Sequence, residues 1–422
     1  MDIEYLLQPD ALAAALSAPH ACWPGSFLRD TVPLRVSQVS RRPERWGVAS
    51  ASVPVRGGSL ALRVLSVQRE PLAGGVSGAH LERALVEIEA GPAARPLRGM
   101  VPLIFKRLKP DESWLMRASG DTRCREVQLW RHGLLADAPP ALCVPVLVAA
   151  YDEETNTGAL LLADVRRWLG RLEDCYAPVA PQQQAQYLDH LARLHARYWE
   201  DTRLKDARFA LASVEQALLM LAPAAIEAQL AAGDTHPYLP VSRAGWEAFF
   251  TYGPPDALAR VQRVFTTPAA YLASAAEAPV TLLHGDAWPA NMGLLPGARG
   301  PRGRRAGGRT ILIDWALATA GPASFDPFWL LFAWKQVDTR LALLAYRQRL
   351  ARHLARRGIS LGAAEWRLLV DLGIVRTVMT CGETMGQDVL FARSEPQRAR
   401  AIAALGRWTR WAANVIERRG WD

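Results

Sequence analysis

Between residues 62 and 155 the order of apolar and polar residues is mainly of the strand type. Short runs rich in apolar residues follow one another there, separated by turn residues, as strands and their connections do. We expect these strands over 62–68, 81–89, 100–107 and 142–151. Two helices complete this part: a short amphipathic helix over 4–17, and a second over 121–135, which Asp121 or Thr122 would cap.

Beyond Leu169 the apolar residues recur at helical spacing. The segment 182–200 carries one apolar stripe, made by Tyr187, Leu188, Leu191, Leu194, Tyr198 and Trp199. Further helices are expected over 212–232, 243–251 and 256–275 and over most of the chain after 324, with short strands at 280–283 and 310–314.

Together these patterns predict an α+β protein with two lobes. Residues 1–158 would form an N-terminal extension and a β-rich N-lobe, residues 159–168 a hinge, and residues 169–422 a mainly helical C-lobe. Because ligands commonly bind in clefts between lobes, we expect the functional site there.

The composition narrows the class of protein. Of the 422 residues, 50% are apolar and 22% are charged, which excludes disordered and collagen-like chains. The five cysteines have no CxxC spacing and no histidine at ligand spacing, so we expect neither a zinc site nor a disulfide framework, and a cytoplasmic location is favoured. No apolar run reaches the roughly 18 residues that span a bilayer, and the start Met-Asp-Ile-Glu does not have the pattern of an export signal.

The net charge of +9 raises the question of nucleic acid. Five arginines in the Gly-rich stretch 297–309 supply +5 of it without a neighbouring acid, and this clustering argues against general DNA or RNA binding. Only four of the 50 basic residues are lysines, namely Lys106, Lys109, Lys205 and Lys335. Because an ordinary surface cation in this chain would more often be arginine, a lysine at the end of an apolar strand indicates a specific role.

The strongest chemical signal is His284-Gly285-Asp286 with Asn291 five residues after the aspartate. It is followed, 23 residues after Asn291, by Asp314 in Ile313-Asp314-Trp315. Each aspartate comes at the end of an apolar strand, which is a rigid support for a carboxylate at the rim of a cleft. Oxygen ligands of this kind suit Mg²⁺, which binds one or two carboxylates together with substrate phosphates.

With these residues the sequence resembles the aminoglycoside phosphotransferase and choline kinase family, which shares the protein-kinase-like fold. Members of that family carry His-Gly-Asp-x-x-x-x-Asn and a later Ile-Asp-Trp or Ile-Asp-Phe, and this chain has both spacings. The resemblance implies Mg²⁺-dependent transfer of the γ-phosphate of ATP or GTP, with Asp286 as the catalytic base and Asn291 and Asp314 as the metal ligands. His284 and Asp326 would support the site structurally.

The predicted N-lobe contains a lysine and a glutamate that match the family pattern. Lys106 ends an apolar strand, and Glu126 follows 20 residues later within the predicted helix. By the resemblance, Lys106 contacts the nucleotide phosphates and Glu126 holds the lysine in place. The alternative is a solvated strand end and an unrelated surface acid.

Two loops are further candidates for nucleotide contacts. The backbone amides of Gly74, Gly75 and Gly78 and the Ser77 hydroxyl could approach phosphate oxygens, although a plain hairpin turn would have the same composition. The segment around Ala163 resembles the family hinge, where backbone groups would contact the nucleotide base.

The phosphate acceptor would be a small hydroxylated molecule. In the family it lies against helices of the C-lobe, here about 202–275 and 364–392, and the candidate lining residues are Asp234, His236, Tyr238, Trp246, Tyr252, Glu383 and Asp388. Acidic groups would suit a cationic amine and tryptophans a quaternary ammonium group. We expect the Arg-rich segment 297–309 to be an insertion, with attraction of an anionic substrate as the alternative.

The sequence thus predicts a small-molecule kinase acting on an aminoglycoside-, amino-alcohol- or sugar-like acceptor. Two alternatives from other classes are a catalytically silent, kinase-like nucleotide-binding or scaffold protein, and a nucleic-acid-associated protein. A protein kinase is a weaker option, because the HGD form and the helical insertion resemble the small-molecule enzymes. Neither the choice between ATP and GTP nor the oligomeric state has a sequence marker.

Overall fold

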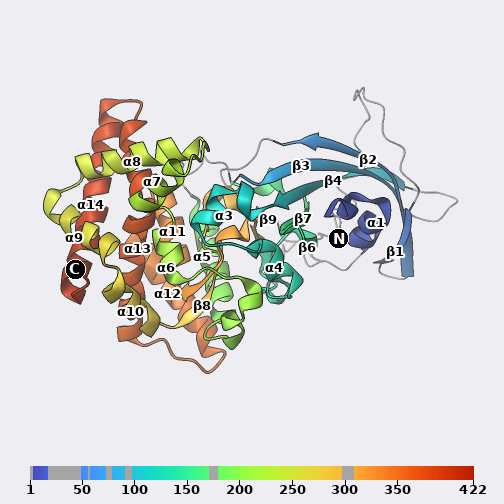
Figure 1. Ribbon diagram of the computed structural model, residues 1–422. Coiled ribbons are helices and arrows are strands. Elements are labelled where there is room, and N and C mark those ends of the chain that lie inside the picture. The colour runs from blue at the N-terminus through green and yellow to red at the C-terminus, as the bar shows by residue number, and fades with distance from the viewer. Residues whose placement is uncertain are drawn as a thin grey trace. The chain divides into compact units, whose positions relative to one another are not determined.

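A computed structural model describes residues 3–17, 49–55, 58–72, 78–90, 97–170, 179–296 and 308–422. The chain forms two compact units. Unit 1 contains residues 1–113, 126–169 and 293–313, and unit 2 contains residues 114–125, 170–292 and 314–422. Unit 1 is rich in strands and unit 2 in helices, which confirms the α+β class with a β-rich and a mainly helical part (Figure 1).

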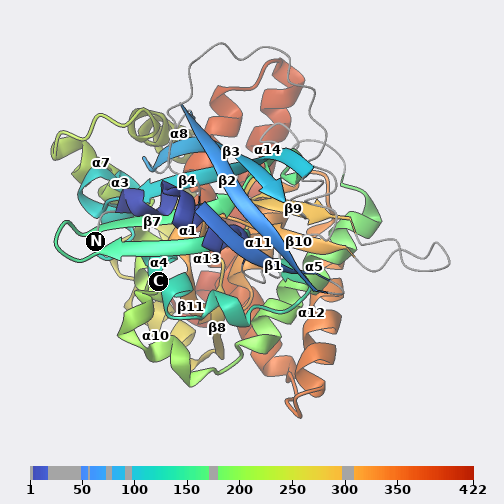
Figure 2. The same cartoon turned by 90° about the vertical axis from the view of Figure 1, so that its right-hand side faces the viewer.

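Unit 1 is built on a six-stranded antiparallel sheet with the strand order β1-β2-β3-β4-β7-β6. Strands β1 to β4 and β7 of this sheet can be followed in Figure 2. The strands are β1 (Ala49–Val55), β2 (Gly58–Pro71), β3 (His80–Ala90), β4 (Leu97–Leu108), β6 (Val146–Asp152) and β7 (Thr157–Ala163). A second sheet, in the order β5-β10-β9, joins β5 (Leu142–Cys143), β10 (Arg309–Leu312) and β9 (Met292–Leu295).

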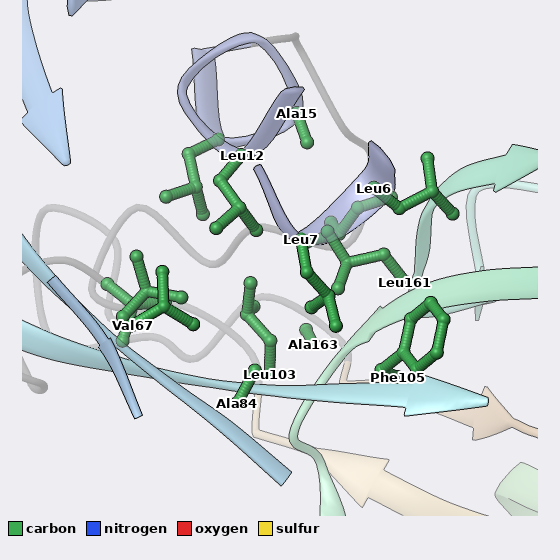
Figure 3. Packing of buried hydrophobic residues seen from close by; sticks show 14 of the residues in the cluster. Leu6, Leu7, Leu12, Ala15, Val67, Ala84, Leu103, Phe105, Leu161 and Ala163 are labelled. Carbon is green, nitrogen blue, oxygen red and sulfur yellow. The ribbon is translucent and has the colours of Figure 1, made fainter. Parts of the chain in front are cut away.

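One face of the large sheet carries the hydrophobic core of unit 1. The 3-10 helix η1 (Ile3–Leu7) and helix α1 (Pro9–Ser17) place Leu6, Leu7 and Leu12 among side chains of the sheet such as Leu103 and Phe105 (Figure 3). Because successive side chains of a strand point to opposite faces, Leu103 and Phe105 lie on the core side and Lys106 on the other side. The alternation in β4 therefore decides which face Lys106 occupies.

Unit 2 consists mainly of helices. They are α3 (Trp114–Ala118), α5 (Pro181–Arg197), α6 (Val214–Leu219), α7 (Pro223–Ala231), α8 (Tyr238–Tyr252), α9 (Pro255–Thr266), α10 (Ala269–Glu277), α11 (Phe325–Ala333), α12 (Thr339–Ala355), α13 (Ala363–Leu390) and α14 (Glu395–Arg419). Helix α13 packs against α8, α14 and α11 (Figure 1). It is buried along most of its length. A two-stranded antiparallel sheet of β8 (Val280–Leu283) and β11 (Thr319–Pro322) completes the unit.

Several predicted elements have different limits in the structure. The helix expected over 121–135 is the shorter α4 (Arg125–Arg131), because Cys124 has a positive φ of 55° that no helix accommodates. Prolines divide two further segments: 212–232 is split into α6 and α7 before Pro223, and 256–275 into α9 and α10 at Pro268. Strands β9 and β11 were not predicted, and the residues expected to be a hinge include most of β7.

Two expectations about composition can be compared with the described residues. Cys124, Cys143 and Cys381 are buried free thiols, whereas Cys22 and Cys175 lie outside those residues. No helix in the described part of the chain is long and apolar enough to cross a bilayer.

Candidate functional site

The first group of candidate residues lies in unit 1 and consists of Lys106 and Glu126. The Lys106 Nζ atom donates a hydrogen bond of 2.7 Å to Glu126 Oε2, from the sheet face opposite the core. Lys106 is 6% exposed and Glu126 1% exposed. A buried ion pair of this geometry holds the ammonium group in one position. The surface-residue alternative for both is therefore wrong, while contact with a nucleotide stays a prediction.

The two candidate loops of unit 1 are only partly described. Gly74, Gly75 and Ser77 lie outside the described residues. Gly78 is exposed and has a φ of +79°, a conformation that favours glycine. The Ala163 N–H donates to the Pro145 carbonyl at 2.9 Å, so this donor is already used, and a base contact at Ala163 stays a prediction.

The second group lies in unit 2, in the loop that follows β8. Asn291 Nδ2 donates hydrogen bonds to Asp286 Oδ2 at 2.8 Å and to the Asp286 carbonyl at 3.2 Å. The Asp286 N–H donates to His284 Nδ1 at 3.3 Å, and the His284 ring packs against Trp315 with 4.6 Å between centroids. These contacts close the loop on itself and orient the Asp286 carboxylate.

The glycine between His284 and Asp286 is required by the backbone. Gly285 has a φ of +83°, and a Cβ atom added to it would lie 1.9 Å from the Leu317 carbonyl oxygen. No other residue type fits both conditions without displacing the segment around Leu317. The close approach brings the loop after β8 against the turn that follows Asp314.

Asp326 supports the same loop from the first turn of α11. It is fully buried, and its carboxylate accepts hydrogen bonds from the backbone N–H groups of His284 (2.8 Å, Oδ2) and Gly285 (2.9 Å, Oδ1). The His195 ring contacts it as well, with Nε2 3.1 Å from Oδ2, while His195 Nδ1 lies 2.5 Å from the Tyr346 hydroxyl. These hydrogen bonds lower the pKa of Asp326 against the effect of burial, so the carboxylate stays ionised and holds the loop.

Asp286 and Asp314 influence one another electrostatically. Burial, and next the negative charge of Asp314, raise the pKa of Asp286 to about 7, although the side chain keeps partial contact with solvent. Asp314 itself has a φ of 63°, a left-handed conformation that non-glycine residues adopt rarely. Backbone strain of this kind is concentrated at functional sites.

Asn291 and Asp314, with the Asp286 carboxylate nearby, offer oxygen ligands that fit magnesium. Two carboxylates that repel each other in an enclosed position are stabilised by a divalent cation, and an amide oxygen can complete a hard-oxygen set. Within the described residues no group of three His, Cys, Asp or Glu side chains is arranged for a metal. The fit therefore rests on the Asp314 carboxylate and the Asn291 amide, which leave coordination positions for phosphate oxygens and water.

A positioning residue of unit 2 was missed by sequence reasoning. Arg125 is fully buried, and its guanidinium donates to the carbonyls of Ala210 (Nε, 2.6 Å), Ser119 (3.1 Å) and Ala316, two residues beyond Asp314. It thereby ties down the turn that carries Asp314. In the sequence, only its position next to the candidate Glu126 could have indicated a role for Arg125, because the partners Ala210 and Ala316 are distant along the chain.

Of the candidate acceptor-lining residues, Glu383 has the most unusual environment. It is 1% exposed and accepts hydrogen bonds from Tyr238 OH (2.7 Å), Thr384 Oγ1 (2.9 Å) and Gln387 Nε2. Burial raises its pKa to about 7. Tyr238 stacks on Trp114 with 5.2 Å between centroids.

The remaining candidates are engaged elsewhere. Asp234 pairs with Arg117, and Asp388 with Lys335 at 2.7 Å. Trp246 lies in an aromatic core with Phe249 and Phe265 and donates to the Leu221 carbonyl, and its role in lining a ligand site stays a prediction. His236 packs on Trp114, and Tyr252 accepts a hydrogen bond from Arg398. Most of the Arg-rich segment lies outside the described residues.

The comparisons with known proteins concern structure alone, since no family model and no curated protein matches the chain. A protein named APH(2″)-IIia, solved with GDP and kanamycin, is similar over 83% of this chain and 95% of its own, at 16% identity and a TM-score of 0.43. A microcompartment-associated aminopropanol kinase is similar over 83% and 92%, at 18% identity and a TM-score of 0.40. The choline kinase LicA from Streptococcus pneumoniae is similar over 82% and 94%, at 12% identity and a TM-score of 0.36.

These proteins are of the kind that the sequence motifs resemble. Because each TM-score is below 0.5, the likeness does not decide what this chain does.

Proposed function

We propose that this protein is a Mg²⁺-dependent phosphotransferase that moves the γ-phosphate of ATP or GTP to a hydroxyl group of a small molecule. The observation that carries the proposal is the arrangement of Asp286. Its carboxylate is oriented by Asn291, lies in the field of Asp314, and belongs to a loop that Asp326 holds through two backbone hydrogen bonds.

Each residue has a role that its contacts suit. Lys106, held by Glu126, binds phosphate oxygens of the nucleotide in unit 1. Asn291 and Asp314 would hold magnesium, which when bound neutralises negative charge on the phosphates. Asp286 accepts the proton of the attacking hydroxyl, and its raised pKa near neutrality matches the requirement for a general base. Positioning and electrostatics account for the catalysis, as in phosphoryl transfer generally.

The test is transfer of labelled γ-phosphate from ATP and from GTP, with magnesium, to a pooled panel of acceptors. The panel contains kanamycin, aminopropanol and choline, which occur in the names of the similar structures, together with sugars and hydroxy amino acids. Label in one acceptor with the wild type, and about 10²- to 10⁴-fold less with Asp286→Asn, is the expected result. Asp256→Asn, an exposed residue of α9, serves as the matched control.

Asp314→Asn distinguishes the metal site from the base. Weaker binding of magnesium-nucleotide, with a higher magnesium requirement, is expected for this variant, whereas Asp286→Asn should still bind nucleotide. Tight binding of magnesium-nucleotide without transfer to any acceptor would favour the alternative of a catalytically silent, kinase-like nucleotide-binding or scaffold protein.

A further inference from the structure

Helix α13 buries a positive charge in unit 2. Arg376 is 2% exposed, and its guanidinium carbon lies 4.8 Å from the centroid of the Phe325 ring and 5.1 Å from that of the Trp329 ring. Aromatic rings stabilise a desolvated cation only in part, and a buried charge normally has an ionic partner. In this environment an anionic partner would stabilise the Arg376 guanidinium.

The described residues do not supply that anion as an ion pair. Arg376 Nε has no hydrogen-bond partner among them. The carboxylates closest to it electrostatically are Asp326 and Asp286, and each is already engaged, the first by His284 and Gly285 and the second by Asn291.

The neutral groups around Arg376 cannot take the place of an anionic partner. Burial raises the pKa of Cys381 to about 12, so this neighbour stays a thiol. The Tyr271 hydroxyl, a second neighbour, donates to the Leu372 carbonyl, and burial raises its pKa as well. Among the residues that the structure describes, no group is therefore left to serve as the anionic partner of Arg376.

Arg376 is also connected to the catalytic loop. Trp329, on which it packs, contacts Trp288 with 6.4 Å between ring centroids, and Trp288 follows Asp286 by two residues. The indole Nε1 of Trp329 is buried, and no described residue accepts its hydrogen bond. Arg376 Nε and Trp329 Nε1, two donors without acceptors among the described residues, thus lie between α13 and the loop of Asp286. The positive charge of Arg376 also lowers the pKa of the Asp286 carboxylate.

We infer that Arg376 and Trp329 Nε1 bind an oxyanion carried by the phosphate acceptor, so that the substrate is a hydroxylated molecule with a carboxylate or phosphate ester group. This inference rests on the proposed phosphotransferase function for the hydroxyl at Asp286. Guanidinium donors lie in the plane of the group, so the Phe325 and Trp329 rings leave them available for two-pronged binding of an oxyanion. Specificity follows, because a neutral acceptor leaves the buried charge unpaired.

The experiment uses three probes with one carbon skeleton: glycerol, glycerate and glycerol 3-phosphate. Binding of each to the full chain is measured by calorimetry with magnesium and a non-hydrolysable ATP analogue, and phosphate transfer with labelled ATP in parallel. One or both anions should bind the wild type at least about 10-fold more tightly than glycerol, and comparison of the two anions distinguishes carboxylate from phosphate ester.

Two conservative variants test the assignment. Arg376→Lys keeps the charge but loses the planar donors, and Trp329→Phe keeps the ring but loses Nε1–H. Each should weaken anion binding by about 10-fold or more, with little effect on glycerol. Arg376→Gln should abolish the preference for anions, and Arg407→Gln, at an exposed position of α14, should leave it unchanged.

The possible outcomes separate this inference from the proposed function. Equal binding of the three probes, no binding of either anion, or an anion preference that survives in folded Arg376→Lys and Trp329→Phe would overturn the inference. Transfer to a neutral acceptor that is unaffected by Arg376→Gln would support the phosphotransferase and refute the anion site. Arg376-dependent binding of an anion without transfer would support the site and refute the activity.

Discussion

The carboxylate of Asp326 accepts the backbone N–H of Gly285 at 2.9 Å across 41 residues of sequence. Through this bond and its neighbour at His284, the first turn of α11 holds the loop that presents Asp286. Asp326 thereby sets the position of Asp286, the residue that is proposed to contact the reacting hydroxyl.

Asp326→Asn should destabilise unit 2. The amide keeps one oxygen but places an NH₂ group where a donor now points, and it removes the charge that faces His195. We expect a loss of roughly 3 kcal/mol in the free energy of unfolding, measured by urea denaturation. Asp256→Asn, at an exposed position, should cost less than about 1 kcal/mol. Similar losses for the two variants would contradict a buried network.

Gly285→Ala separates backbone conformation from close contact. Gly285 and Gly233 have nearly equal φ angles, +83° and +82°, but a Cβ would meet the Leu317 carbonyl only at Gly285 and open space at Gly233. Gly233→Ala should cost about 1–2 kcal/mol, and Gly285→Ala about 1–3 kcal/mol more, with loss of phosphate transfer. Thermal unfolding and phosphate-transfer assays check this prediction. Equal losses of stability in Gly285→Ala and Gly233→Ala would show that the close contact with Leu317 does not contribute.

Lys106 and Glu126 should be energetically coupled. In a double-mutant cycle with Lys106→Met and Glu126→Gln, the buried ion pair predicts a coupling energy of about 1–3 kcal/mol in unfolding. Lys106→Met should also raise the dissociation constant for nucleotide, measured by titration. A coupling energy below about 0.5 kcal/mol would mean that the contact contributes little.

The pH dependence of phosphate transfer should follow Asp286. Its pKa of about 7 means that the carboxylate is protonated below neutrality and cannot accept a proton there. The rate constant kcat/KM should therefore fall as pH decreases below about 7 and level off above it. Higher magnesium should move the midpoint to lower pH, because a cation favours the ionised carboxylate. A flat profile between about pH 5 and 9 would remove Asp286 from the role of base.

Glu383 should make the folded state less stable as pH rises. Its pKa is about 7 when folded and near the ordinary 4.5 when unfolded, so the folded chain retains a proton that the unfolded chain releases. The contribution is fully present below about pH 4.5 and lost as pH rises through about 7, by up to about 3 kcal/mol. Glu383→Gln should remove this slope, whereas Glu247→Gln, an exposed control on α8, should keep it.

The sequence by itself determined the local parts of this protein. The apolar pattern of β4 predicted a strand over 100–107 that carries Lys106 near its end. The spacing from His284 to Asn291 predicted a loop that brings the side chains of Asp286 and Asn291 together, and the two are hydrogen-bonded. Such features depend on neighbours a few residues away, because strand alternation and short hydrogen-bonded loops are local. The breaks at Cys124 and Pro268 limited this approach even for helices.

Only the tertiary structure decided which distant groups meet. It brought Glu126 to Lys106, Asp326 to Gly285 and Arg376 into the electrostatic range of Asp286, 90 positions apart in the chain. Burial and neighbouring charges also shifted the pKa values of Asp286, Asp326 and Arg376, because the free energy of a charge depends on how much water and which partners surround it. Those surroundings come from the packing of α11 and α13, which no local pattern in the sequence specifies.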